Sequence, residues 1–148
     1  MYPKILVPLD GSELAECVLP DVIDIAKGPG GSEVVLFRVC EPAVVLADYP
    51  TDLNLGWETA DTQQQCRLYL DDIEKKLKEA GLNVTTDSGL GNRAELIVDY
   101  AARNQFDLII MASHGRSGAV RWAYGSTSDK ILRSSPLSVM MIKCGQTF

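Results

Sequence analysis

The sequence predicts an α/β fold in which one open parallel five-stranded sheet is covered by helices on both faces. Short apolar runs alternate with longer amphipathic segments along all 148 residues. Strands that alternate with helices in this way pair in parallel through right-handed crossovers. A chain of this length that is 46% hydrophobic has the size of one domain with a complete core, so we expect a single domain over residues 1–148.

The first part of the chain contains two predicted strands separated by an interrupted helix. Lys4 to Leu9 is a nearly continuous apolar run, as expected for a strand covered on both faces. Asp10-Gly-Ser12 supplies turn and N-cap residues for a helix over Glu13 to Lys27, which Pro20 is expected to bend or interrupt. After a glycine-rich turn, Glu33 to Cys40 is the second predicted strand.

The middle of the chain is predicted to be a loop followed by a long helix. Glu41 to Trp57 has no clear period, and at this length it is expected to be either a functional loop or a mobile one. Thr59 to Ala80 is expected to form an amphipathic helix that ends at Gly81. Its predicted core positions are Leu68, Ile73 and Leu77.

The last part of the chain contains three predicted strands and two predicted helices. Asn83 to Asp87 alternates weakly and is the third strand, whereas Phe106 to Met111 is the apolar fourth strand. Asn92-Arg-Ala-Glu95 resembles a capping box, which opens a helix. Ser126 to Arg133 is the predicted last helix, and Leu137 to Lys143 the fifth strand. The core face of the capped helix is expected to include Leu96, Ile97, Tyr100 and Ala101.

A glycine-rich segment connects the fourth strand to the last helix. Gly115 and Gly125 stand ten positions apart and Ser126 follows directly, which is neither a Walker A loop nor a compact G-x-G-x-x-G turn. Backbone N–H groups in such a segment can approach an anion without obstruction by Cβ, and a helix N-terminus adds partial positive charge. The segment is therefore either a phosphate-binding loop or only a tight connection.

Charge restricts the classes of partner. The formal net charge of −6 argues against general affinity for nucleic acid or anionic membranes, because both require a cationic surface. The sign reverses in the stretch from Ser113 to Arg133, where Asp129 is the single acid, so an anion is expected to bind there. The basic residues of this stretch are Arg116, Arg121, Lys130 and Arg133.

Two absences indicate a soluble cytoplasmic protein without a metal centre. The N-terminus lacks the pattern of a signal peptide, and no apolar run approaches the ~20 residues that cross a bilayer. The cysteines form no C-x-x-C pair and the chain has a single histidine, so no zinc site is expected. We predict buried free thiols at Cys17, Cys40, Cys66 and Cys144.

Five stretches of the chain together match one known family. They are I-L-V-P-L-D-G-S at Ile5 to Ser12, V-V-L-F-R-V ending at Val39, G-L-G-N-R-A-E-L-I at Gly89 to Ile97, D-L-I-I-M-A-S-H-G-R-S-G at Asp107 to Gly118, and G-S-T-S-D-K-I-L at Gly125 to Leu132. Through them the chain resembles the universal stress protein family over essentially its whole length. The resemblance implies the strand order 3-2-1-4-5, which is Rossmann-like, and a homodimer formed through Leu137 to Lys143.

For the nucleotide-binding branch, the resemblance also implies an ATP site, with Mg²⁺ as a possible companion ion. Asp10 would accept hydrogen bonds from the ribose hydroxyls, and the backbone of Val39 would contact the adenine edge. The glycine-rich segment and the start of the last helix would hold the phosphates. The implied nucleotide-binding residues are Pro8, Leu9, Asp10, Val39, Met111, Ala112, His114, Gly115, Arg116, Gly118, Gly125, Ser126, Thr127 and Ser128.

One position departs from the family pattern G-x2-G-x9-G-S/T. Ala112 stands where the first glycine is expected. Alanine is tolerable if the residue has a negative φ and its methyl group points away from the ligand, but not if the backbone requires a positive φ. The alternative is a nucleotide-free interaction module, as in the other branch of the family.

Several candidate residues also have purely structural interpretations. Asp10 is also a natural turn residue, and Ser126 a natural N-cap. Arg116 and Arg121 are also interpretable as solvated surface charges, and His114 has no evident nucleophile partner. Trp122 and Tyr124 are expected to cover the loop or the core rather than to stack on a base.

The favoured function is a nucleotide-dependent regulator or switch in the stress response. No Walker B sequence, paired acids or evident general base accompany the loop, so no catalytic residue is assigned and at most slow ATP hydrolysis is expected. A third hypothesis is a flavodoxin-like electron carrier, which the absence of flavin colour would exclude.

Overall fold

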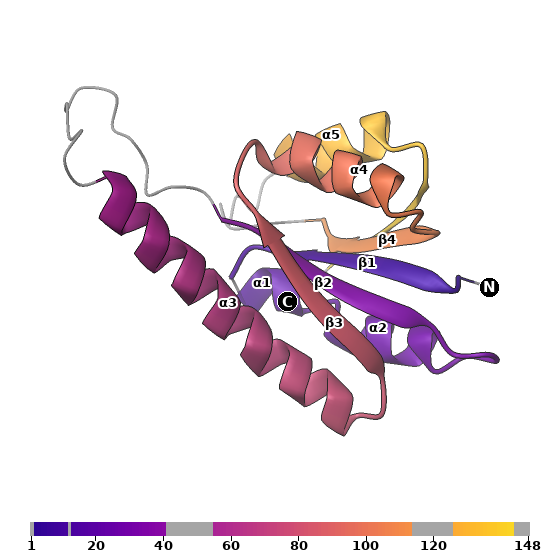
Figure 1. Ribbon diagram of the computed structural model, residues 1–148. Coiled ribbons are helices and arrows are strands. Elements are labelled where there is room, and N and C mark those ends of the chain that lie inside the picture. Colours follow the sequence, from indigo (N-terminus) through magenta and orange to yellow (C-terminus); the bar gives the residue numbers. More distant parts are fainter. Residues whose placement is uncertain (1, 12, 41–54, 114–125, 144–148) are drawn as a thin grey trace, which may run out of the picture.

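The sheet contains five parallel strands in the predicted order. A computed structural model describes residues 2–11, 13–40, 55–113 and 126–143. The strands lie in the order β3-β2-β1-β4-β5, which confirms the predicted fold class and topology (Figure 1). All four pairings are parallel. The strands are β1 (Lys4–Leu9), β2 (Glu33–Val39), β3 (Asn83–Gly89), β4 (Leu108–Ala112) and β5 (Ser138–Ile142).

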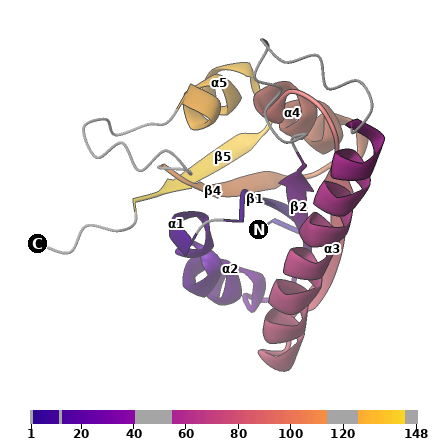
Figure 2. The same cartoon turned by 90° about the vertical axis from the view of Figure 1, so that its left-hand side faces the viewer.

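Helices cover both faces of the sheet. The helices are α1 (Glu13–Glu16), α2 (Leu19–Ala26), α3 (Leu55–Glu79), α4 (Arg93–Arg103) and α5 (Ser126–Ser134). Figure 2 shows α1, α2 and α3 on one face and α4 and α5 on the other. Alternate residues of β1 enter the two resulting cores, because successive side chains of a strand point to opposite faces. Ile5 and Val7 pack against the α1–α3 layer, whereas Leu6 packs against α4 and α5.

The first helical segment is interrupted, as Pro20 predicted. It divides into α1 and α2, and Pro20 lies in the first turn of α2. Proline is tolerated there because the first N–H groups of a helix have no partner within the helix. The carbonyl oxygen of Val18 accepts the hydrogen bond from Val22 N at 2.9 Å, which starts the regular ladder of α2.

The long helix α3 begins earlier than predicted. Residues 55–57, expected to end a loop, are helical, and residues 41–54 of that predicted loop lie outside the described part of the chain. The expected core position Leu68 was also wrong, because its side chain is 61% exposed. Buried residues instead recur at intervals of four, three and four along α3, which is one helical face. They are Cys66, Leu70, Ile73 and Leu77.

The caps of α3 and α4 form as predicted. Gly81 has φ +95°, and its N–H donates to Lys78 O at 2.9 Å, so glycine closes α3 in a conformation that other residues rarely adopt. Asn92 Oδ1 accepts a hydrogen bond from Glu95 N at 3.2 Å at the start of α4. Tyr100 of α4 stacks on Phe37 of β2, with ring centroids 4.3 Å apart. This ring contact holds α4 over β2.

Three of the four cysteines predicted to be free thiols are disulfide-bonded, which corrects the sequence prediction, and Cys144 lies outside the described residues. Cys40, directly after β2, is disulfide-bonded to Cys66 of α3, with the two Cα atoms 6.3 Å apart. Cys17 is also disulfide-bonded. The chain fold creates the pairing between β2 and α3, because Cys40 and Cys66 are 26 positions apart in the sequence and no sequence motif links them. No helix in the described ranges is long and apolar enough to cross a membrane.

Candidate functional site

The candidate site lies at the carboxyl ends of β1 and β4, the two central neighbours at which the chain changes direction. From β1 the chain passes through α1 and α2 to β2, whereas from β4 it passes through α5 to β5 on the other side. The two connections cover opposite faces of the sheet (Figure 2). Diverging connections of this kind leave a crevice at the carboxyl ends of the strands, where ligands bind in open α/β sheets.

The strand registers bring the predicted residues from three strands to this edge. Leu6 pairs with Ile109, so counting three residues along each strand places Leu9 level with Ala112. Leu9 also pairs with Arg38 of β2, so Asp10 follows at the level of Val39. Pro8 and Leu9 are buried in β1, and Met111 is buried in β4. The register therefore places Asp10, Val39 and Ala112 at the same edge of the sheet.

The start of α5 is bonded to the end of β4. Ser113 N donates to Ile142 O at 2.9 Å, which continues the pairing of β4 with β5. Ser128 Oγ, in the first turn of α5, donates to Ser113 O at 3.2 Å. Both serines are buried, at 1% and 3% exposure. The N-terminal turn of α5 is thus held beside the crevice, where its backbone N–H groups and dipole favour an anion.

One buried polar atom at this junction has no hydrogen-bond partner among the residues that the structure describes. Ser113 Oγ is shielded from solvent and makes no hydrogen bond within the described residues. Most buried hydroxyl groups in native proteins are hydrogen-bonded, so a ligand, an ion or a water molecule at this position would complete the arrangement. Residue-type reasoning did not select Ser113, although it directly follows the last residue of the fourth strand.

Ala112, the departure from the family pattern, occupies a regular strand position. Among the described residues Gln105 is the one non-glycine with a positive φ, so the backbone at Ala112 does not require glycine. Ala112 is 7% exposed, and it belongs to the apolar core between the sheet and the α1–α3 layer. The backbone condition for a tolerated alanine is therefore met, and the methyl group is packed in the core.

Part of the predicted site falls beyond the described residues. His114, Gly115, Arg116, Gly118 and Gly125 lie outside them. Ser126 and Thr127 begin α5, but their side chains are also outside the description. Of the four basic residues expected to attract an anion, Arg133 forms an ion pair with Asp129, with Nε 3.2 Å from Oδ2. Lys130 is exposed on the same helix.

A polar cluster beside Asp10 was not anticipated from the sequence. The guanidinium carbon of Arg38 lies 4.9 Å from the ring centroid of Tyr69, and Tyr69 Oη donates to Glu16 Oε2 at 2.9 Å. Burial, together with the hydrogen bond to Glu16, raises the pKa of Tyr69 above its ordinary value. The available signal was Arg38 itself, which interrupts the apolar run V-V-L-F-R-V of β2.

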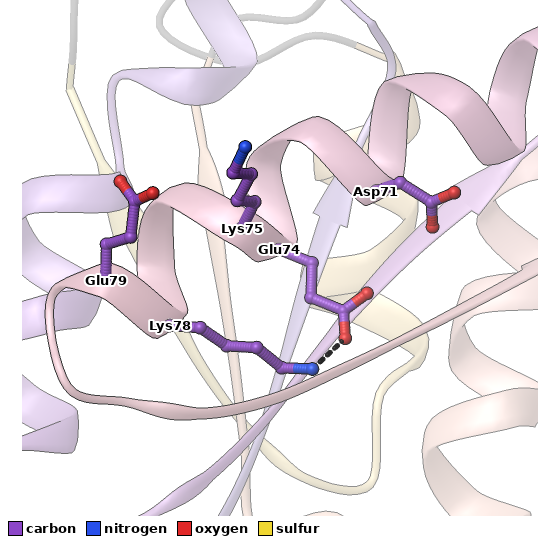
Figure 3. Close-up of a pocket in the computed structure, with 5 residues that line it drawn as sticks. All are labelled: Asp71, Glu74, Lys75, Lys78 and Glu79. Carbon is purple, nitrogen blue, oxygen red and sulfur yellow. Dashed lines mark ion pairs between the residues drawn. The ribbon is translucent and has the colours of Figure 1, made fainter.

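Two other surface hollows lie away from the carboxyl ends of β1 and β4. Figure 3 shows a shallow hollow on α3 that is lined by charged side chains of this one helix and contains the ion pair between Lys78 Nζ and Glu74 Oε1, 2.7 Å apart. Such i,i+4 pairs are typical of a solvated helix face. A second hollow lies between α4 and α5 and includes Leu96, Val98 and Lys130. Neither includes a residue of the crevice at the carboxyl ends of β1 and β4.

Comparison with known proteins gives one consistent family. The profile of the universal stress protein family matches residues 1–143. Universal stress protein MJ0577 from Methanocaldococcus jannaschii is 28% identical over 97% of this chain and 96% of its own length. The solved structure of MJ0577 has a TM-score of 0.87 and covers 99% of both chains at 27% identity.

More distant solved structures share the fold. Universal stress protein UspA from Lactobacillus plantarum has a TM-score of 0.82 at 23% identity and covers 95% of this chain and 97% of its own. A universal stress protein in complex with cAMP has a TM-score of 0.71 at 17% identity and covers 96% of this chain and 97% of its own.

Proposed function

Because the chain belongs to the universal stress protein family, we propose that it binds ATP at the carboxyl ends of β1 and β4 and acts as a nucleotide-dependent regulator in the stress response. The observation that carries this proposal is the bond between Ser128 Oγ and Ser113 O, which holds the N-terminus of α5 beside the end of β4. A fixed helix N-terminus next to a strand end is a natural phosphate site. Asp10 lies across the same crevice.

The residues present suit an adenine nucleotide. The Asp10 carboxylate would accept hydrogen bonds from ribose hydroxyls, and the backbone of Val39 would meet the adenine edge. Backbone N–H groups of α5 would receive the phosphates, with Mg²⁺ as a companion ion. The unpartnered Ser113 Oγ supports this assignment because a polar ligand at the crevice would satisfy it. The cAMP complex of a structural relative supports the same class of ligand.

ATP is proposed as a bound effector rather than as a substrate that turns over rapidly. Charged side chains of the crevice and its rim include Asp10 and Arg38, and we assign no catalytic residue. Positioning of an attacking water and stabilisation of the transferred phosphoryl group are the main requirements of fast hydrolysis. We therefore expect hydrolysis to be slow, with the nucleotide changing how the protein meets a partner.

The nucleotide-free interaction module remains the second candidate because Ala112 replaces the motif glycine. The regular strand conformation at Ala112 and its buried methyl group favour the nucleotide-binding candidate. We further propose a homodimer through β5, whose outward edge carries the half-buried residues 139–142. An unpaired apolar strand edge invites pairing with a second copy. Light scattering that finds a monomer at micromolar protein would contradict the dimer.

Calorimetric titration of the purified protein with Mg-ATP tests nucleotide binding. We expect saturable heat with a dissociation constant below ~1 mM, which is ~4 kcal/mol of binding free energy. GTP serves as the matched control, because it carries the same triphosphate and ribose but a different base edge. Absence of heat and of competition at millimolar ATP would favour the nucleotide-free module instead.

A further inference from the structure

Arg38 is a partly buried cation in an otherwise buried strand. From Val34 to Val39, all residues of β2 except Arg38 are buried. A charged group inside a folded chain is costly unless neighbouring groups compensate for its lost hydration. Among the described residues, Gly11 in the turn after β1 and Tyr69 of α3 lie against the guanidinium.

The guanidinium lies between a glycine backbone and an aromatic ring. A Cβ placed on Gly11 would be 2.8 Å from Arg38 Nη2 and 2.9 Å from Cζ, so the guanidinium lies directly against the backbone of Gly11. Gly11 has φ +85°, a conformation that other residues rarely adopt. On another side, the ring centroid of Tyr69 is 4.9 Å from Cζ, which is cation–π geometry.

Further bonds fix this arrangement. Tyr69 Oη donates to Glu16 Oε2 at 2.9 Å, which connects α3 to α1. Cys66 lies one helical turn before Tyr69, and its disulfide to Cys40 joins α3 to the end of β2. Arg38 is therefore held from its own strand, from α3 and, through Tyr69, from α1. The guanidinium is consequently a rigid support against the backbone of Gly11.

Asp10 directly precedes the glycine that Arg38 supports. Burial and the hydrogen bond to Glu16 raise the pKa of the Tyr69 hydroxyl, and the charges of Asp10 and Arg38 act on it in smaller and opposite ways. The backbone that the guanidinium contacts is thus one residue away from the carboxylate of Asp10.

We propose that Arg38 is a positioning residue that, through Gly11, fixes Asp10 for the recognition of ribose hydroxyls. This inference rests on the proposed ATP site and adds the residue that sets its selectivity for the sugar. Arg38 acts through its neighbour and need not touch the nucleotide. Its loss would reduce discrimination between ribose and a sugar without hydroxyls, and it would leave the binding of base and phosphates largely intact.

The test compares ATP with 2′,3′-dideoxy-ATP by calorimetry on the wild-type protein and on Arg38→Met. We expect the wild type to prefer ATP by about tenfold or more, as hydrogen bonds to a charged acceptor require. In Arg38→Met the preference should fall to within about twofold of unity, with dideoxy-ATP affinity changed by less than about twofold. Arg103→Met is the matched control, because Arg103 is an exposed residue at the end of α4 that forms an ion pair with Asp99.

Each outcome decides between distinct conclusions. A folded Arg38→Met protein that keeps the full preference for ATP overturns the positioning role. If Arg38→Met does not fold, Arg38→Lys is tested instead, because lysine keeps the charge but not the planar group. A folded Arg38→Lys protein that keeps the full preference for ATP also overturns the proposal. Equal wild-type affinity for both nucleotides refutes the ribose contact of Asp10 but not nucleotide binding. Failure of the wild type to bind either nucleotide refutes the proposed function itself.

Discussion

Ser128 Oγ donates a hydrogen bond to the carbonyl oxygen of Ser113 at 3.2 Å, and both residues are buried. This bond joins the first turn of α5 to the end of β4, so the position of the helix N-terminus depends on it. The two serines are 15 positions apart in the sequence. The contact therefore holds the N-terminus of α5 against the carboxyl end of β4.

Replacement of Ser128 by alanine should loosen this junction. We expect Ser128→Ala to lower the free energy of unfolding by ~1 kcal/mol, the usual value of a net hydrogen bond. ATP affinity should fall about fivefold, which corresponds to a similar energy. Ser134→Ala makes the same change at an exposed position of α5 and should alter neither quantity. Unchanged ATP affinity in a folded Ser128→Ala protein would remove this junction from the site.

Replacement of Ala112 by glycine should not improve nucleotide binding. The alanine methyl group is buried in the core and its backbone is regular, so it does not obstruct the ligand. Loss of the methyl group and the added freedom of glycine should cost ~1–2 kcal/mol of stability. Calorimetry should give an ATP affinity within about twofold of the wild type. A large gain in affinity would show instead that the methyl group blocks the site.

Reduction of the disulfides should destabilise the protein. Cys40 and Cys66 enclose 26 residues, for which loop-closure entropy predicts about 3.5 kcal/mol. Urea unfolding with and without reductant measures this difference. The variant Cys17→Ala lacks the disulfide of Cys17, and reductant should still lower its stability by opening Cys40–Cys66. In Cys40→Ala/Cys66→Ala this loss of stability should be absent. Equal stability of the oxidised and reduced Cys17→Ala protein would contradict the prediction.

Stability should also decline at high pH because of two tyrosines. Burial, followed by hydrogen bonds to Glu16 and Asp87, raises the pKa values of Tyr69 and Tyr100 above the ordinary ~10. Below pH ~10 both hydroxyls are protonated in the folded and unfolded states, and the full stabilisation is present. Above it the unfolded chain loses these protons first, so the free energy of unfolding falls as pH rises.

Urea unfolding from pH 9 to about pH 11.5 measures this loss, across the ordinary tyrosine pKa of ~10. The double variant Tyr69→Phe/Tyr100→Phe should show a shallower decline, because phenylalanine has no proton to lose. A decline as steep as that of the wild type would assign the effect to other groups.

Local sequence signals predicted much of the fold. The apolar run of β1, the Asn92 cap and Gly81 each act through neighbouring residues, so their patterns are readable from the sequence. The interpretation of α3 failed at Leu68, because its helical face is set by contact with the sheet and not by hydrophobicity alone.

Contacts between distant segments could not be predicted in the same way. The Cys40–Cys66 disulfide and the approach of Arg38 to Gly11 join residues that no spacing rule connects. In the candidate site, the glycine-rich segment and the start of the last helix were interpretable as an anion site from the sequence alone, whereas the ribose role of Asp10 came from the family resemblance. Ser113 was identified only because the fold buries its hydroxyl without a partner among the described residues. Arg38 was identified only because the fold packs its guanidinium against Gly11.

Whether ATP binds in the crevice between β1 and β4 is tested most directly by calorimetric titration of Asp10→Ala with Mg-ATP beside the wild type. The matched control is Asp72→Ala, since Asp72 is an exposed acid on α3 that pairs with Lys76. We expect the dissociation constant to rise at least about tenfold in Asp10→Ala, as the loss of charged hydrogen bonds requires, and to stay unchanged in Asp72→Ala. Equal ATP affinity in the wild type and a folded Asp10→Ala protein would contradict the proposed site.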